Sequence, residues 1–197
     1  IDVRLGGDAA FDQLVAACRD MGLQVMLDGV FNHVSRNHPA VQTALDETAG
    51  RLNPADNPWH GLVRAHVGDN GEPALDVFEG HGDLVALDHS ADETVDYVAH
   101  VMSHWLDRGA AGWRLDAAYA VPSPFWARVL PQVKAAHPYS WIFGEVIHGD
   151  YPRIIEESTM DSITQYELWK SIQHALETEN FFELDWNLKR HNAFLDS

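Results

Sequence analysis

Two patterns of apolar residues alternate along this chain. In the first, apolar residues recur every three or four positions, which is the spacing of one face of an α-helix. This pattern predicts helices over residues 8–22, 90–109 and 123–137, a short helix near 154–155, and another through 168–176. The second pattern is a short, mostly apolar run, which is typical of a buried strand. It predicts strands over 23–27 and 141–143, a strand around Trp113, and a weak strand over 162–164.

Helices and strands alternate in this prediction, which is typical of a parallel sheet covered by helices. The alternation is interrupted between residues 34 and 88, where Pro, Gly, Asn and Asp are frequent and no sustained helical stripe is predicted. Because a βαβ unit needs only about 30 residues, something of roughly 50 residues is inserted after the first strand. A doubly wound sheet and a (β/α) barrel both fit this order.

Polar side chains close three of the predicted strands. Asp28 ends the first strand, Arg114 and Asp116 end the second, and Glu145 ends the third. Parallel strands bring their C-terminal ends to one edge, so we expect these side chains to share a site. Polar residues at the ends of consecutive strands also favour the barrel over the open sheet.

Two carboxylates across a cleft suit cleavage of a glycosidic bond, with one as the proton donor and the other as the nucleophile or the base. Arg114 would keep Asp116 ionised and oriented, and the apolar run before Glu145 predicts a raised pKa for that carboxyl group. An Arg-x-Asp pair at a strand end is also a common structural salt bridge. The pattern alone therefore leaves catalysis open.

Composition narrows the class of partner. The 197 residues carry a formal net charge of −17, which argues against nucleic acid or an anionic membrane as a partner. No apolar run reaches the ~18 residues of a membrane span. The hydrophobic content of 46% suits the core of one domain. The single Cys18 cannot form an internal disulfide, and its helical stripe predicts a core position.

Aromatic residues on helical stripes are expected in the core, and these are Trp105, Trp126 and Trp169. Trp59, in the Pro- and Asn-rich insert, and Tyr119, just past Asp116, are better candidates for stacking against a sugar ring. We also expect the helix at 90–109 to begin with a capping box at Ser90-Ala-Asp-Glu93.

Three short motifs resemble those of the alpha-amylase family of glycoside hydrolases (family 13, retaining). Asp28-Gly-Val-Phe-Asn32-His33 is similar to the first motif of that family, Gly112-Trp-Arg114-Leu-Asp116-Ala to the second, and Phe143-Gly-Glu145-Val to the third. Their order and spacing match, including the long insert after the Asn-His pair. The resemblance covers essentially the whole chain and implies part of a TIM (β/α)8 barrel, about strands 3 to 6, with a domain B-like insertion after strand 3.

The resemblance assigns the chemistry to three residues. It implies that Asp116 is the nucleophile that forms a covalent glycosyl-enzyme, and that Glu145 is the general acid/base. It implies that Arg114 orients Asp116. The reaction expected from these roles is hydrolysis of an alpha-glucoside with retention of configuration.

The resemblance also implies contacts with an α-linked oligosaccharide or disaccharide. His33 would donate a hydrogen bond to the sugar that is cleaved, and Asp28 and Asn32 would support the first motif from below. Position alone adds two candidates: Tyr119 lies just past Asp116, and His148 follows Glu145 closely enough to line the leaving-group side.

The sequence departs from calcium-binding alpha-amylases just after the nucleophile. Those proteins continue with Lys-His, whereas this chain has Tyr119 and Ala120. The His of the family lends a backbone carbonyl to calcium, so Ala120 does not forbid the metal. The insert nevertheless lacks a dense set of oxygen ligands, and Ca²⁺ takes 6–8 of them. We therefore assign no metal ligand and expect no required cofactor. The missing Lys removes one contact on the leaving-group side.

A second departure concerns the family's fourth motif, Asn-His-Asp, which is absent from residues 1–197. That motif supplies a third carboxylate, and only four of the eight barrel strands are predicted here. We expect residues 1–33 and 89–197 to be a barrel fragment, residues 34–88 to be the inserted region, and the chain to be the middle of a larger enzyme. Alone it should be inactive.

The motifs leave several functions open. Hydrolases, transglycosylases and isomerases of trehalose or maltose in this family share the same constellation, and differ in whether water or a sugar intercepts the glycosyl-enzyme. A non-catalytic carbohydrate-binding relative is the alternative from another class. A nucleotide-binding open sheet is disfavoured because the sequence has no Gly-rich phosphate loop.

Overall fold

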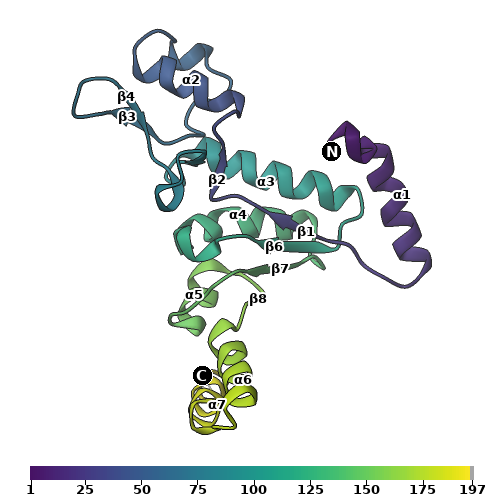
Figure 1. The fold of residues 1–197 in the computed structure, drawn as a ribbon. Coiled ribbons are helices and arrows are strands. Elements are labelled where there is room, and N and C mark those ends of the chain that lie inside the picture. The colour runs from purple at the N-terminus through teal and green to yellow at the C-terminus, as the bar shows by residue number, and fades with distance from the viewer. Residues whose placement is uncertain (196–197) are drawn as a thin grey trace.

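The computed structural model describes residues 1–195, and its centre is a parallel sheet of four strands (Figure 1). The strands pair in the order β1 (Met26–Gly29), β6 (Gly112–Leu115), β7 (Trp141–Gly144) and β8 (Ser162–Ile163). All three pairings are parallel. Each strand lies beside the next sheet strand in the chain, as in a (β/α) barrel, and the order does not reverse as in a doubly wound sheet. The α/β class is confirmed, and the sheet is consistent with part of a TIM barrel.

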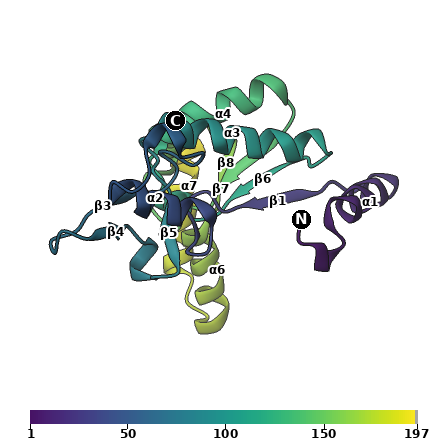
Figure 2. The same ribbon diagram turned by 90° about the horizontal axis from the view of Figure 1, so that it is seen from above.

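Helices precede each strand of this sheet. They are α1 (Gly7–Asp20), α3 (Asp92–Asp107), α4 (Ser123–Ala136) and α5 (Tyr151–Ser158). Two further helices, α6 (Tyr166–Thr178) and α7 (Phe182–Leu195), follow β8 and project from the sheet as a pair (Figure 1). Helices α3 and α4 lie side by side along one face of the sheet, as Figures 1 and 2 both show.

The main core lies between α3, α4 and the sheet. Trp113, Leu115 and Ile142 are buried on the face toward the helices, and each such side chain contributes roughly 1.5–3 kcal/mol by leaving water. The indole Nε1 of Trp113 donates to the Met102 carbonyl at 3.3 Å, so this buried polar atom has a partner. Side chains alternate along a strand. The opposite face therefore carries Asp28 and Arg114, which are paired in register.

The region between β1 and α3 forms its own small structure beyond the C-terminal ends of the strands (Figure 1). Strand β2 (His33–Ser35) pairs antiparallel with β5 (Leu84–Ala86), and β3 (Ala65–Val67) pairs with β4 (Pro73–Leu75). A second hydrophobic cluster lies within it, formed by Ala40, Val41, Ala44, Leu62, Val63, Val85 and Leu87.

The sequence predicted no sustained helix in this region, and that prediction was wrong. Helix α2 spans Pro39–Thr48, with His38 Nδ1 accepting a hydrogen bond from the Ala40 amide at its start. Its buried face consists of small residues, Ala40, Val41 and Ala44. Helical periodicity is recognised from large apolar side chains at regular spacing. This ten-residue helix has few of them on its buried face, so its pattern was not detected.

The first strand begins later than predicted, at Met26 instead of Leu23. Leu23 belongs to the end of α1, where its amide donates to the Cys18 carbonyl at 2.8 Å and the Gly22 amide donates to Arg19 at 3.0 Å. Gly22 is in the left-handed region, with φ +72°, as this type of helix end requires. The strand also ends later, at Gly29, so Asp28 lies inside β1 and not after it.

The predicted capping box at Ser90 does not form. The N-cap of α3 is Ala91, without a side-chain hydrogen bond, and the Ser90 hydroxyl donates to Asp88 at 2.6 Å. Of the three Trp residues expected in the core, Trp126 is buried and Trp105 is partly buried against the cluster. Trp169 on α6 is 59% exposed. Periodicity identifies the apolar face of a helix but not what covers it.

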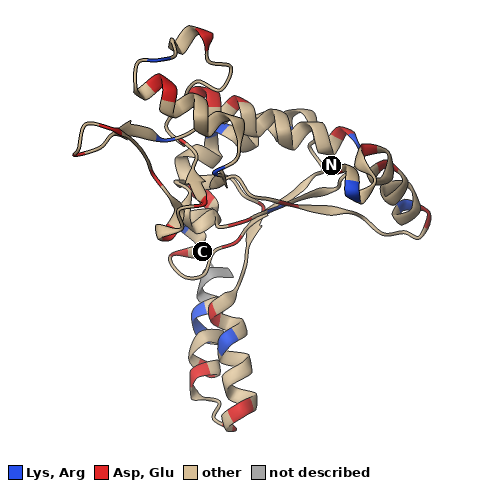
Figure 3. Ribbon diagram, turned by 45° about the horizontal axis from the view of Figure 1, so that its top comes forward, with Lys and Arg blue, Asp and Glu red and all other residues tan. Residues whose placement is uncertain are grey.

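Charge is spread widely over the surface. Figure 3 shows Asp and Glu on α1, on the region between β1 and α3, and on the α6–α7 pair, with Lys and Arg interspersed. The acidity is therefore a general property of the molecule and not that of one patch. Among residues 1–195, none of the helices is both long enough and apolar enough to cross a membrane.

Candidate active site

Asp116 and Glu145 directly follow neighbouring strands, and the backbone hydrogen bonds of the sheet continue onto them. The Asp116 amide donates to the Gly29 carbonyl at 3.0 Å, and the Glu145 amide donates to the Leu115 carbonyl at 2.9 Å. These bonds fix where each side chain leaves the sheet. Both carboxylates are thereby held at the same C-terminal edge, as the sequence predicted.

The guanidinium of Arg114 joins three carboxylates. Nη1 lies 2.5 Å from Asp28 Oδ1 and 3.0 Å from Asp116 Oδ1, and Nη2 lies 3.0 Å from Glu145 Oε1. Burial alone would lower the pKa of Arg114, but its hydrogen bonds to Asp28 and Asp116 and the charge of Glu145 raise that pKa above its ordinary value. Because adjacent nitrogens of one planar group hold Asp116 and Glu145, the two acids face a common space.

Glu145 has a lowered pKa, which corrects the raised value predicted from the preceding apolar run. Burial does raise its pKa, but three donors outweigh burial: the Ala117 amide at 3.0 Å from Oε2, the Tyr166 hydroxyl at 2.9 Å from Oε1, and Arg114. Each of these donors favours the charged form. The ligand-free site therefore favours Glu145 as a carboxylate.

The chain bends sharply just past Asp116 and thereby supplies one of those donors. Ala117 has φ 46° and ψ 34°, in the left-handed region, which costs a residue other than Gly about 1 kcal/mol or more. This conformation directs the Ala117 amide at Glu145, and two residues on the Tyr119 amide donates to the Glu145 carbonyl at 3.1 Å. The bend therefore ties the segment after β6 to the end of β7.

His33 and Asn32 lie beside this cluster. Asn32 is buried, and its Nδ2 is 3.2 Å from His33 Nδ1. The His33 ring stacks on Phe78, with ring centroids 4.9 Å apart and an angle of 19° between the planes. Burial lowers the pKa of His33, and the charge of Asp116 partly opposes this. The ring of His33 is thus within electrostatic reach of Asp116.

Tyr119 is half-exposed, and its hydroxyl donates to Glu79 Oε1 at 3.0 Å. His148 is exposed and makes no hydrogen bond or ion pair with the Arg114 cluster in the part of the chain that the structure describes. Trp59 packs edge-on against His38 and Tyr97, next to the second hydrophobic cluster. Its ring therefore contributes to the packing of that cluster.

Three residues of the site were not predicted from the sequence: Phe78, Glu79 and Tyr166. Phe78 and Glu79 lie in the insert, where no motif or period marks them, and they reach the site only through folding of that region. Tyr166 begins α6, 21 residues after the carboxylate that it contacts. The sequence contains no spacing signal that connects these residues to Glu145 or His33.

The resemblance to calcium-binding alpha-amylases draws attention to the backbone around Ala120 as the place for a calcium ion. Ala120 lines a pocket of about 270 Å³ together with Asn32, Glu79, His89 and Arg64, and the positive guanidinium of Arg64 opposes a second cation. Across residues 1–195 no group of three or more His, Cys, Asp or Glu side chains could hold a metal ion. The His-x-x-x-His pair on α3, His100 and His104, has ring centroids 6.5 Å apart and belongs to no such group among the described residues.

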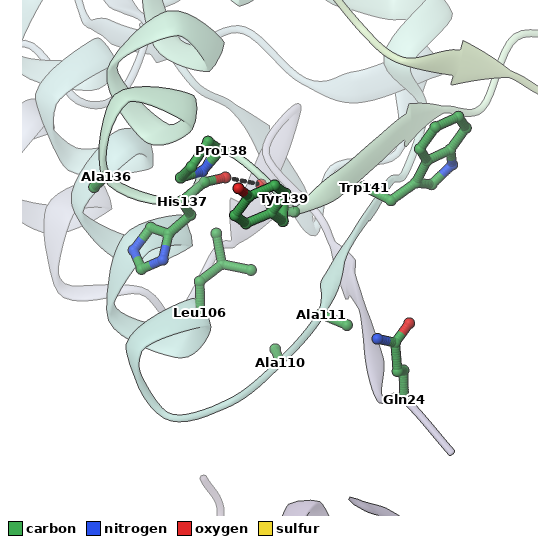
Figure 4. A pocket seen from close by; sticks show the side chains of 10 residues that line it. Gln24, Leu106, Ala110, Ala111, Ala136, His137, Pro138, Tyr139 and Trp141 are labelled. Atoms are coloured by element: carbon green, nitrogen blue, oxygen red, sulfur yellow. Dashed lines mark hydrogen bonds between the residues drawn. The ribbon is translucent and has the colours of Figure 1, made fainter. Parts of the chain in front are cut away.

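A larger pocket lies at the opposite end of the sheet (Figure 4). Its volume is about 390 Å³, and Ala111 and Ser140, the residues just before β6 and β7, line it together with His137 and Tyr139. Asp116 and Glu145 follow the other ends of the same strands. This pocket is therefore remote from the carboxylates.

Comparison with known proteins decides the family. The sequence model of the alpha-amylase catalytic domain matches residues 1–183. The chain belongs to the alpha-amylase family. The three motifs noted above fall within the matched range, so the Arg114 cluster lies in a catalytic domain of alpha-amylase type.

Among curated relatives in this family, a cyclomaltodextrinase from Bacillus sp is 29% identical over 84% of this chain and 29% of its own length. A maltogenic alpha-amylase from Bacillus acidopullulyticus is 28% identical over 87% of this chain and 29% of its own length. The chain therefore spans under a third of the length of these curated relatives.

Solved structures of the alpha-amylase family show the same fold. A cyclic alpha-maltosyl-(1→6)-maltose hydrolase from Arthrobacter globiformis matches with a TM-score of 0.73 at 26% identity, over 87% of this chain and 38% of that one. A debranching enzyme from Nostoc punctiforme matches with a TM-score of 0.68 at 28% identity, over 85% and 35% of the two chains.

Proposed function

We propose that this chain is the central part of the catalytic domain of a retaining alpha-glucoside hydrolase. The observation that carries the proposal is the shared guanidinium of Arg114, which holds Asp116 and Glu145 at the ends of adjacent strands, 3.0 Å from each. Retaining enzymes need two carboxyl groups that face the same glycosidic bond. One attacks the anomeric carbon, and the other donates and accepts a proton.

The proposed reaction has two steps. In the first, Asp116 attacks the anomeric carbon while Glu145 donates its proton to the glycosidic oxygen, so that the leaving sugar departs as an alcohol and a glycosyl ester forms on Asp116. In the second, Glu145 takes a proton from water, and the oxygen of that water displaces Asp116 from the anomeric carbon. Because the free site favours the Glu145 carboxylate, Glu145 must gain its proton before or during substrate binding.

Around these two groups, we propose supporting roles for the remaining predicted residues. Arg114 orients Asp116, and His33 donates to the sugar that is cleaved. Asn32 holds His33, at 3.2 Å, and Asp28 anchors Arg114 from β1. Tyr119 lies near the leaving group. For His148, a place on the leaving-group side is proposed only from its position shortly after Glu145.

The proposed substrates are alpha-linked glucose oligosaccharides. Support comes from relatives named cyclomaltodextrinase and maltogenic alpha-amylase. Transfer to a sugar acceptor, or isomerisation of maltose or trehalose, uses the same glycosyl-enzyme. Product analysis with maltose, maltooligosaccharides and trehalose distinguishes these reactions from hydrolysis.

We further propose that the sheet corresponds to about strands 3 to 6 of a (β/α) barrel formed by residues 1–33 and 89–197, of which 196–197 lie outside the described residues. Residues 34–88 would then be the domain B-like insertion. The separate strand pairs and hydrophobic cluster of that region support the division. The third carboxylate of the family would come from a part of the enzyme outside this sequence.

The nucleophile is tested in an enzyme with the complete barrel. Asp116→Ala should lower turnover of maltotriose by about 10⁴-fold or more, the scale expected when a nucleophile is removed. The control is Asp69→Ala, which removes an exposed carboxylate between β3 and β4. A slow fluorinated glucoside should add one glycosyl unit to Asp116, detected by mass spectrometry.

Two outcomes would overturn the proposal. The first is full activity of Asp116→Ala. The second is a wild-type enzyme that binds maltooligosaccharides without cleaving them, which would indicate a binding relative. The 197-residue chain by itself should show no turnover, because the third carboxylate is absent from it.

A further inference from the structure

One segment of the insert reaches the active site, and it is the turn Phe78–Gly80. Phe78 stacks on His33 of the first motif. Glu79 accepts a hydrogen bond from the hydroxyl of Tyr119, which follows the second motif. Just before the turn, Val77 forms an isolated bridge with Val85, next to the strand pair β2–β5. The turn is therefore fixed against the residues at the ends of both β1 and β6.

The backbone of this turn is strained where Glu79 sits. Glu79 has φ 48° and ψ 32°, and Gly80 follows with φ 78°. A left-handed conformation costs a residue with a Cβ about 1 kcal/mol or more, and glycine adopts it freely. Strain of this kind is retained where the surroundings over-determine it, often at functional sites. Here the left-handed residue is also the one whose side chain contacts Tyr119.

Glu79 and Tyr119 lie on the side of the acid/base. The Tyr119 amide donates to the Glu145 carbonyl at 3.1 Å. Burial and the hydrogen bond to Glu79 raise the pKa of the Tyr119 hydroxyl, and the charges of Glu79, Glu145 and Asp116 raise it further. Tyr119 is thus bonded through its backbone to Glu145, the proposed acid/base, and through its hydroxyl to Glu79 of the insert. In the proposed mechanism, the group nearest Glu145 is the leaving sugar.

The chemistry of the pair suits a sugar. Glu79 is exposed, and Tyr119 is the one hydrogen-bond partner of its carboxylate in the described part of the chain, which leaves Oε2 able to accept from a sugar hydroxyl. The half-exposed ring of Tyr119 offers an apolar face beside that acceptor. Hydrogen bonds to a charged acceptor are the stronger kind.

We infer that Glu79, positioned by Tyr119, is a specificity-determining residue that accepts hydrogen bonds from the glucosyl unit on the leaving-group side. This inference rests on the proposed function and adds to it a residue from the insert. It follows that the insert contributes to the choice between sugar and other leaving groups.

The test compares two substrates that differ in the leaving group, using the enzyme with the complete barrel. In maltotriose the leaving group is a sugar, which carries hydroxyl groups. In 4-nitrophenyl alpha-maltoside the leaving group is 4-nitrophenolate, which has no sugar hydroxyl groups. In Glu79→Gln, kcat/KM for maltotriose should fall about tenfold or more, the scale of one lost charged hydrogen bond. For the aryl glycoside it should be little changed. Tyr119→Phe should show the same selective loss, to a smaller extent.

The matched control is Glu72→Gln, which removes an exposed carboxylate from the same insert next to β4. It should leave both substrates unaffected. An equal loss on both substrates in Glu79→Gln would overturn the inference, because it indicates a general structural role. Unchanged cleavage of maltotriose would overturn it as well. If the wild-type enzyme cleaves neither substrate, the proposed function itself fails.

Discussion

A single guanidinium ties together carboxylates from three strands of the site. Arg114 contacts Asp28 of β1, Asp116 after β6 and Glu145 after β7. Without that positive charge, three carboxylates at such short range would repel one another and take up protons. Arg114 therefore makes the close approach of Asp116 and Glu145 electrostatically tolerable, in addition to the orienting role proposed for it.

The hydroxyl of Tyr166 provides a direct test of how Glu145 is tuned. It donates to Glu145 Oε1 at 2.9 Å and helps to hold the pKa of that carboxyl below its ordinary value. Removing the donor in Tyr166→Phe should raise the pKa. Since Glu145 is protonated in the first step of the proposed mechanism, the enzyme should then stay active to higher pH. The profile of kcat/KM against pH reports the pKa values of the free enzyme. Its alkaline limb should therefore shift to higher pH.

The control for this pH profile is Tyr139→Phe. Tyr139 is 97% exposed at the opposite end of the sheet, so its profile should coincide with that of the wild type. An alkaline limb that stays in place or moves to lower pH in Tyr166→Phe would contradict the prediction.

At the residue scale, the sequence predicted that Asp116 and Glu145 lie close together, but not the direction in which the pKa of Glu145 is shifted. Asp116 and Glu145 could be recognised because each directly follows an apolar strand, where parallel pairing brings them to one edge. The direction of the Glu145 pKa shift depends on donors from Ala117 and Tyr166. One of these comes from a left-handed turn and the other from a later helix, and neither is visible in local sequence.

At the scale of the elements, strands β6 and β7 pack so closely at Gly112, the first residue of β6, that no side chain fits there. A Cβ at this position would lie 2.0 Å from the Trp141 carbonyl oxygen of β7. That contact is with backbone and not with a flexible side chain, so the strands would have to separate.

Gly112→Ala should therefore destabilise the domain by roughly 1–3 kcal/mol, the usual cost of overpacking. The measurement is the thermal unfolding midpoint of the complete enzyme. Gly82→Ala is the control, because a Cβ there meets nothing within 4 Å and the backbone is not left-handed. Equal midpoints for the two variants would show that β6 and β7 have room to separate.

Elements with strong apolar periods were predictable, and those that depend on small residues or on a helix end were not. Helix α3, with large side chains in the main core, was predicted from its stripe. Helix α2 was missed because its buried residues are mostly Ala. Leu23 was placed in a strand because it is apolar and follows Gly22, whereas the two residues together complete the end of α1.

At the scale of the whole molecule, the pocket beside Ala120 raises the question of whether the enzyme requires calcium. Arg64 lines this pocket, so we propose that no calcium ion is held there. Dialysis of the complete enzyme against EDTA should leave both kcat and the unfolding midpoint unchanged. A bound ion at 100 times its Kd would contribute about 2.7 kcal/mol, which its removal would make visible as a lower midpoint.

A calcium-dependent alpha-amylase treated in parallel is the control for the chelator. Activity that is lost in EDTA and restored by Ca²⁺ would contradict the prediction.

The order of strands in the sheet has a consequence for how the molecule is made on the ribosome. Strands β6, β7 and β8 each find their neighbour one helix away, so these pairings can form soon after synthesis. Strand β1 must wait until residues 30–111 have emerged before β6 exists to pair with it. Asp28, Asn32 and His33 are thus translated early but join Arg114 only after the intervening region has closed its loop. Nascent chains that stall before residue 112 would have β1 without β6 beside it.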